Sequence, residues 1–183
     1  MGQYYRPIIL KKGYKRLVNP IAASFESWSY GNGSKLMEHS YIGNGFVRAV
    51  EEMLSFEYNG YPFVWCGDYA DDLKAKKYEG NLYDSAYLLK NKCDIKLERE
   101  IVERKYLINY TKRQYLELEK YEPGLLKIHP LPLLCCNSNG RGGGDYHGTN
   151  MRYVGYWAFN RIGVGNEIPK GFRKLDVTFE EER

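Results

Sequence analysis

The stretch that decides the fold class is residues 44–66, NGFVRAVEEMLSFEYNGYPFVWC. Its first half repeats apolar residues at the spacing of one helical face. These residues are Phe46, Val47, Val50, Met53 and Leu54. The pattern predicts a helix over residues 45–56, with Asn44 as its N-cap. The aromatic and β-branched run at 61–66 that follows is typical of a short buried strand.

Strand-like segments lie on both sides of this unit. They are residues 4–10, 17–25, 104–110, 113–121, 153–164 and 172–179. Pro7 removes a hydrogen-bond donor from the first segment and predicts an edge or first strand, and Pro20 predicts a break or bulge in the second. The third and fourth segments alternate with period two, so they predict a hairpin that turns at Thr111 and Lys112.

Two further segments are less regular. Residues 82–91 predict one or two helical turns. Residues 125–136 are apolar but contain Pro130 and Pro132, which predicts an edge strand or a bent approach to a loop. Together the elements predict a single α+β domain over residues 1–183, mainly an antiparallel sheet with the one firm helix packed on it.

Length and composition indicate a soluble globular chain. A length of 183 residues suits one domain with its own core, and 43% hydrophobic with 27% charged residues is ordinary for such a chain. No apolar run approaches the roughly 18 residues that predict a membrane-spanning helix. The start of the chain shows no signal-peptide pattern and the cysteines form no Cys-x-x-Cys pair, so we expect a cytoplasmic protein with no membrane partner.

Charge and tyrosine content leave the partner open. The chain has 27 Lys and Arg against 23 Asp and Glu, a formal net charge of +4, which permits nucleic-acid binding without requiring it. The 18 tyrosines are compatible with two interpretations. One is a β-rich fold with Tyr on half-buried strand faces, and the other is a large interaction surface for protein or nucleic acid.

The most irregular stretch is residues 137–148, with Asn-Gly-Arg-Gly-Gly-Gly-Asp-Tyr-His at its centre. Glycines allow a close approach of the backbone to a ligand, and successive N–H groups beside an Arg can bind an anion. The stretch matches neither the P-loop nor the dinucleotide fingerprint, so a plain turn between strands is the alternative to a phosphate- or backbone-contacting loop. The candidate binding residues here are Arg141, Gly142, Gly143, Gly144 and Tyr146.

Three carboxylates suggest a metal-dependent alternative. Asp68 and Asp71 follow the predicted buried strand, and Asp145 ends the glycine-rich run. If the two loops meet, these residues would hold Mg²⁺ for a nuclease, with His147 or His39 as general acid or base. The alternatives are solvated or helix-capping carboxylates and hydrogen-bonded structural histidines.

Aromatic and basic residues also gather near the C-terminus. They are Arg152, Tyr153, Tyr156, Trp157, Phe159 and Arg161. Such a mixture can stack bases and neutralise phosphates, which makes Trp157 and Arg161 candidate binding residues. The same alternation also describes an ordinary strand.

Several motifs are short but spread from residue 1 to about residue 164. They are Met1-Gly2-Gln3-Tyr4-Tyr5, Gly33-Ser34-Lys35-Leu36-Met37-Glu38, Gly67-Asp68-Tyr69-Ala70-Asp71, Asn139-Gly140-Arg141-Gly142-Gly143-Gly144-Asp145, and Trp157 with Arg161-Ile162. These motifs resemble those of a group of small uncharacterised proteins carried by bacteria, phages and mobile elements. In its size and this phage-like context, rather than in any motif, the protein also resembles the anti-CRISPR proteins that inhibit type II (Cas9) systems. That second resemblance implies binding to Cas9, to its guide RNA, or to both.

Three functions follow as alternatives. The favoured prediction is an anti-CRISPR-type inhibitor that binds a Cas9 nucleoprotein effector or its guide RNA and needs no cofactor. The second is a Mg²⁺-dependent nuclease that acts on RNA or DNA, and the third is a phosphate-ligand-binding protein. The mild positive charge fits contact with guide RNA or another nucleic acid better than mimicry of DNA, which needs a large negative excess.

Overall fold

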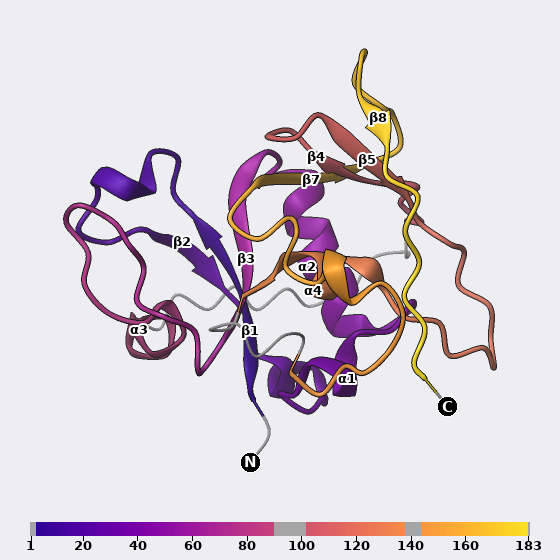
Figure 1. Ribbon diagram of the computed structural model, residues 1–183, viewed down its shortest axis with the longest axis horizontal. Helices are drawn as coiled ribbons and strands as arrows, with labels where there is room; N and C mark the ends of the chain where they lie inside the picture. Colours follow the sequence, from indigo (N-terminus) through magenta and orange to yellow (C-terminus); the bar gives the residue numbers. More distant parts are fainter. Residues whose placement is uncertain (1–2, 90–101, 138–143, 183) are drawn as a thin grey trace.

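The structure of the protein is a computed structural model that describes residues 3–89, 102–137 and 144–182. In these parts of the chain the helices are α1 (Leu36–His39), α2 (Gly45–Ser55), α3 (Leu82–Leu89) and α4 (Pro130–Cys135). The strands are β1 (Tyr5–Leu10), β2 (Ile21–Ser24), β3 (Tyr61–Gly67), β4 (Tyr106–Asn109), β5 (Gln114–Glu117), β6 (Cys136–Asn137), β7 (Arg161–Gly165) and β8 (Arg173–Lys174). Short 3-10 helices are η1 (Tyr14–Arg16), η2 (Ser27–Tyr30) and η3 (Met151–Tyr153). The elements form a single α+β domain (Figure 1).

The described strands form one mixed sheet of 8 strands in the order β2-β1-β3-β7-β4-β5-β8, with β6 added beside β3. The pairs β3–β6 and β5–β8 are parallel, and the other neighbours are antiparallel. On one side β3 pairs with β1, and on the other it pairs first with β7 and then with β6. The predicted α+β class with a mainly antiparallel sheet is therefore confirmed.

Helix α2 begins where its sequence predicts. The Asn44 side chain accepts hydrogen bonds from the N–H groups of Phe46 (2.9 Å) and Val47 (3.3 Å), two donors that have no partner inside the helix. The apolar stripe is buried against the sheet, with Val50 and Leu54 fully inaccessible. The helix and the following strand β3 therefore form as the local pattern predicts.

Alternation along the central strands builds two cores, one on each face of the sheet. In β3, Phe63 and Trp65 join the larger core, which also contains α2 and α4, while Val64 and Cys66 join the smaller one. The smaller core is closed by α3, which packs on β1 and β3 through Leu82 and Ala86. Among the described residues, helices therefore cover both faces of the sheet only around β1 and β3.

The expectation of one firm helix is corrected, because the described residues contain four α-helices. The segment 125–136, for which the sequence predicts an edge strand or a bent approach to a loop, contains α4 instead. Pro130 and Pro132 lie in the first turn of this helix, where backbone N–H groups have no helical acceptor, so the missing donors cost little. His129 caps the helix by accepting the N–H of Leu131 at 3.1 Å.

The strand predictions hold for β1, β3 and the hairpin, with differences elsewhere. β1 is the first strand but is not an edge, since it pairs with both β2 and β3; Pro7 lies opposite Phe25, at the end of β2, where one lost donor is tolerated. The segment 153–164 is mostly turns and becomes a strand only in β7, and 172–179 forms only the two-residue β8 before an extended tail.

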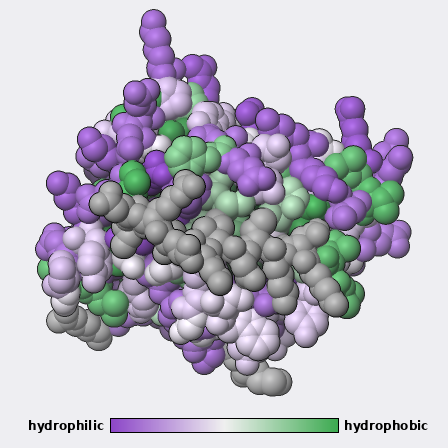
Figure 2. Space-filling view, turned by 180° about the vertical axis from the view of Figure 1, so that it is seen from behind, coloured by the Kyte–Doolittle hydropathy of each residue, from purple (hydrophilic) through white to green (hydrophobic). Residues whose placement is uncertain are grey.

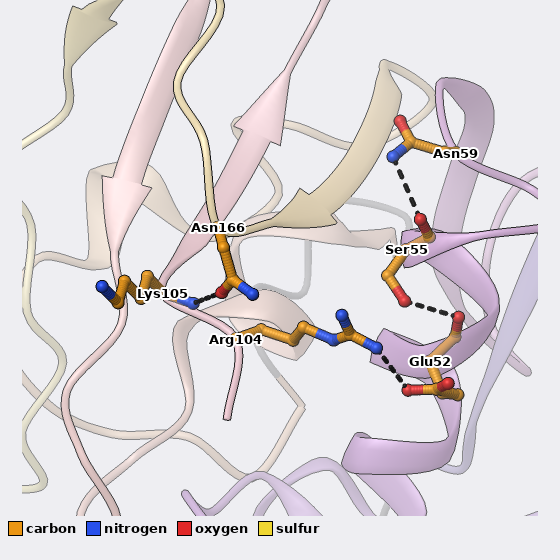
Figure 3. A network of polar contacts seen from close by, with 6 residues as sticks. All are labelled: Glu52, Ser55, Asn59, Arg104, Lys105 and Asn166. Carbon is orange, nitrogen blue, oxygen red and sulfur yellow. Dashed lines mark hydrogen bonds and ion pairs between the residues drawn. The ribbon is translucent and has the colours of Figure 1, made fainter. Parts of the chain in front are cut away.

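A small polar network ties the end of α2 to the start of β4 (Figure 3). Arg104 donates to Glu52 at 2.9 Å across these two segments, and its guanidinium lies 4.9 Å from the ring centre of Phe56. Next along the chain, the N–H of Lys105 donates to the side chain of Asn166 at 3.1 Å. These contacts fix the direction in which the chain enters the β4–β5 hairpin.

Seen from behind, the surface carries hydrophilic side chains along its upper edge and hydrophobic residues in separate patches (Figure 2). Within the described residues, none of the helices combines the length and apolar character needed to cross a bilayer.

Candidate nucleic-acid interface

One half of the sheet has a face that α3 does not cover. The sequence of β7, RIGVG, sends Ile162 and Val164 into the larger core and leaves Gly163 and Gly165 on the opposite face. In the same way, Leu107 of β4 and Leu116 of β5 enter that core, so their neighbours point away from it. In Figure 1, β4, β5 and β7 lie along the top, α2 and α4 lie below them, and no helix is drawn above.

Four half-buried aromatic rings occupy this face, which we call the open face. They are Tyr106, Tyr110, Tyr115 and Phe172. The ring centres of Tyr106 and Tyr115 are 5.7 Å apart, and those of Tyr110 and Phe172 are 5.9 Å apart, both edge to face. Space for the Tyr110 ring exists because residue 163 is glycine: a Cβ there would lie 2.8 Å from that ring.

Two exposed arginines complete the open face. The guanidinium of Arg161 lies 5.8 Å from the centre of the Tyr110 ring, and that of Arg113 lies 6.0 Å from the centre of Phe172. Arg161 is held in place because its Nε donates to the carbonyl of Gly60 at 2.9 Å. Neither arginine forms an ion pair within the described part of the chain.

Two more cation–ring pairs lie beside the open face at the turn of the hairpin. Lys112 lies 4.3 Å from the ring centre of Tyr156, and Arg152 lies 4.9 Å from that of Tyr153. A further pair, Lys12 at 4.8 Å from the ring centre of Tyr61, lies on the other face of the sheet, because Tyr61 pairs in register with Ile162 and both contact the larger core. A band of positive charge therefore borders the aromatic rings.

This arrangement suits one kind of chemistry. Half-exposed rings on a sheet can stack unpaired bases, and unpaired Arg and Lys side chains beside them can contact phosphates. A cation over a surface ring is stabilised by about 0.5–1 kcal/mol, so the cations are ordered without losing their charge.

The structure divides the binding residues that the sequence proposed. Arg161 lies on the open face, but Trp157 is fully buried and its indole N–H donates to Gln114, so its ring does not face a partner. Tyr146 is likewise buried, with its hydroxyl bound to backbone carbonyls of Thr149 and Glu180. These two aromatic residues are therefore assigned to the core.

The glycine-rich loop is only partly described. Arg141, Gly142 and Gly143 lie outside the described residues. Gly144 is described, and it has a φ of 59° with its Cα against the ring of Tyr5, where a Cβ would come within 2.6 Å. Its role as a contact residue for a partner stays a prediction.

The carboxylates proposed for Mg²⁺ bind backbone amides. Asp68 accepts the N–H of Tyr4 at 3.1 Å, and Asp145 accepts the N–H of Met37 at 3.0 Å near the start of α1. Asp71 is exposed in the loop after β3. Among the described residues, no group of three or more His, Cys, Asp or Glu side chains is placed to share a metal ion. Asp145 thus matches the helix-capping alternative, whereas Asp68 binds an amide that precedes strand β1.

The two candidate histidines have opposite surroundings. His39 is fully buried: its Nδ1 lies 3.0 Å from the carbonyl of Gly33, and its Nε2 accepts the indole N–H of Trp65 at 3.1 Å. Burial lowers the pKa of His39, so the neutral form is favoured. Both ring nitrogens are used inside the protein, as in the structural alternative, whereas His147 is exposed.

Most residues of the open face were not singled out from the sequence. Tyr106, Tyr110, Tyr115, Arg113 and Phe172 belong to the predicted hairpin and last strand, and period-two alternation would have placed the three tyrosines on one face. That no helix in the described parts of the chain covers this face depends on where α3 packs, which no local pattern records.

Comparison of the chain with protein-family models, with curated proteins and with solved structures finds no match.

Proposed function

We propose that the protein is a non-enzymatic binding protein that holds single-stranded RNA on its open face. The partner predicted from the sequence is a Cas9 nucleoprotein effector or its guide RNA, and we take the guide RNA as the ligand of this face, whose occupation would make the protein an inhibitor. The observation that carries the proposal is the sheet face, covered by none of the helices described, on which Tyr106, Tyr110, Tyr115 and Phe172 lie beside Arg113 and Arg161.

Charge and geometry support single strands over duplex. Base stacking on aromatic side chains needs bases that are not already paired, and it contributes about 1–3 kcal/mol per base. The face is part of a sheet, and it presents rings rather than a helix that could enter a major groove. The cations around it have no acidic partners among the described residues, so they are available for phosphates.

A binding measurement tests the proposal directly. Fluorescence anisotropy with a labelled single-stranded RNA is expected to show binding by the wild-type protein. The Lys112→Glu/Arg113→Glu variant should bind at least about tenfold more weakly, because two phosphate contacts become repulsive. Tyr115→Ala should also weaken binding, by about 1–3 kcal/mol, if a base stacks there.

The matched control reverses two exposed lysines elsewhere. Lys76→Glu/Lys77→Glu makes the same change in net charge in the loop before α3, and both lysines are exposed. It should leave the affinity for RNA within about twofold of wild type, apart from the general field of the protein. Equal losses in the two double variants would reject the open face as the binding site.

The choice of target is tested separately. Purified protein is mixed with Cas9, labelled guide RNA and target DNA, in Mg²⁺ or in EDTA, and both nucleic acids are examined on a gel. Loss of target cleavage with an intact guide is the expected result. Shortening of guide or target by the protein only in Mg²⁺ would instead support the nuclease prediction, with Asp68→Ala and Asp145→Ala as the next variants.

A further inference from the structure

A groove of about 790 Å³ lies beyond the end of β5, next to the open face. It runs between the end of β5, the segment 126–130 and the tail 174–181 that follows β8. In Figure 1 this tail descends along the right side of the molecule, beside the chain that follows β5. A groove of this volume has room for several residues of an extended peptide.

The floor of the groove is apolar. Leu118, Ile128 and Val177 line it and pack on the larger core. Leu126, which also lines the groove, is 73% exposed. Because covering this leucine would remove apolar surface from water, binding of an apolar side chain in the groove is favourable.

The walls of the groove are acidic although the chain as a whole is basic. Its lysines, Lys127 and Lys174, are already paired with carboxylates that also line it, at 2.8 Å to Glu119 and 3.3 Å to Glu117. The remaining lining carboxylates are exposed and form no ion pair within the described residues; they are Asp176, Glu180 and Glu181. A partner with positive charge therefore fits this groove better than a nucleic acid.

An unpaired strand edge opens onto the same groove. The N–H groups of Arg173 and Leu175 donate to the carbonyls of Arg113 and Tyr115, so alternate residues of β5 direct their backbone groups toward β8 and the tail. Glu117 is the next residue of β5 whose backbone groups point in this direction. Strand β8 ends at Lys174 and does not extend far enough to pair with it. Among the described residues, no backbone hydrogen bond joins Glu117 to the tail.

We propose that this groove binds an extended segment of a protein partner in which lysine or arginine alternates with apolar residues, by strand addition beside β5. Backbone groups of Glu117 would pair with the segment, apolar side chains would cover Leu118 and Leu126, and basic side chains would face the carboxylates. Proteins that hold nucleic acids carry such basic segments, so a nucleoprotein partner would meet the open face through its RNA and the groove through its protein. The groove proposal does not depend on RNA binding.

The test uses the full chain and two defined peptides. One fluorescein-labelled peptide of about nine residues alternates lysine with valine, and the other replaces every lysine by glutamate. Anisotropy should show binding of the lysine peptide only. Asp176→Lys/Glu181→Lys should weaken that binding at least about tenfold, and Leu126→Ser should weaken it about threefold, since one apolar contact is lost.

The matched control is Asp71→Lys/Asp72→Lys, which makes the same charge change at two exposed carboxylates outside the groove. Equal weakening in the two double variants, or equal binding of both peptides, would overturn the proposal. A wild-type dimer in light scattering that the groove variant dissociates would also overturn it, in favour of a second copy of this chain. The groove variant should keep its RNA affinity, so failure here is distinguishable from failure of the open face.

Discussion

Among single residues, His39 shows most clearly how burial sets chemistry. Trp65 donates to Nε2, so the ring proton must be on Nδ1, from which it is donated to Gly33. Phe46 packs edge to face against the imidazole with ring centres 5.1 Å apart. Burial removes the water that would stabilise the charged ring, and this is the physical reason that the pKa of His39 is lowered. A protonated ring would in addition lose the acceptor at Nε2 that Trp65 uses.

This histidine predicts a pH dependence of stability. The folded protein resists protonation of His39, while the unfolded chain binds that proton below its ordinary pKa of about 6.5. The free energy of unfolding should therefore be fully retained above that pH and should fall as pH decreases below it. The contribution is up to about 1.4 kcal/mol per pH unit until the folded pKa is reached. Urea unfolding between pH 8 and 5 measures it.

Two histidine variants assign the effect. His39→Asn should remove this part of the slope, although it lowers stability at every pH. His147→Asn, at an exposed histidine, should leave the slope as in the wild type. If both variants keep the wild-type slope, His39 is not the group responsible.

Among the elements, the C-terminal tail depends most on one close backbone contact. Gly148 and Glu181 form an isolated antiparallel bridge, and a Cβ at residue 148 would lie 2.0 Å from the carbonyl oxygen of Glu180. The tail delivers Leu175, Val177 and Phe179 to the larger core. The short pairing of β8 with β5 is thus supplemented by an anchor near the end of the tail.

Replacement of that glycine should detach the anchor. Gly148→Ala is expected to lower the free energy of unfolding by about 1–3 kcal/mol, because neighbouring backbone must move to admit the methyl group. Limited proteolysis should then cut near the tail at lower protease concentrations. Gly45→Ala is the matched control, since nothing lies within 4 Å of its added Cβ. A Gly148→Ala protein as stable as this control would show that the tail shifts freely.

For the whole molecule, the distribution of charge matters more than its sum. A net charge of +4 hides a band of unpaired cations around the open face and an acidic groove beyond β5. The β4–β5 hairpin links them, because Arg113 lies at its turn and Glu117 at the far end of β5. Binding at the two surfaces should therefore respond to opposite ligand charges.

The salt dependence of the affinity for RNA measures how many cations of the open face contact phosphates in the intact protein. Each phosphate contact with single-stranded RNA contributes about 0.7 to the slope of log affinity against log salt concentration. Arg113→Gln/Arg161→Gln should therefore reduce the magnitude of the slope by about 1.4. Lys76→Gln/Lys77→Gln should leave it unchanged. An unaltered slope in the arginine variant would mean that these two residues do not contact phosphate.

The sequence is enough to predict those helices and strands that are specified by residues close together in the chain. Asn44 and the apolar stripe behind it specify α2, and the run that follows specifies β3, because capping and side-chain periodicity act within a few residues. The hairpin was predicted for the same reason. The prediction for residues 125–136 was wrong because Pro130 and Pro132 lie in the first turn of α4. Proline is disfavoured in the interior of a helix but not in its first turn.

The candidate site depends on contacts between segments far apart in the chain. Whether Trp157 faces a partner or Gln114, and whether Tyr110 lies under a helix or against solvent, depends on how β7 and β4 pair and on where α3 packs. Asp68 and Asp145 likewise received their backbone donors from residues 64 and 108 positions away. Burial and exposure are properties of the packed chain as a whole, so no local pattern of residue types could supply them.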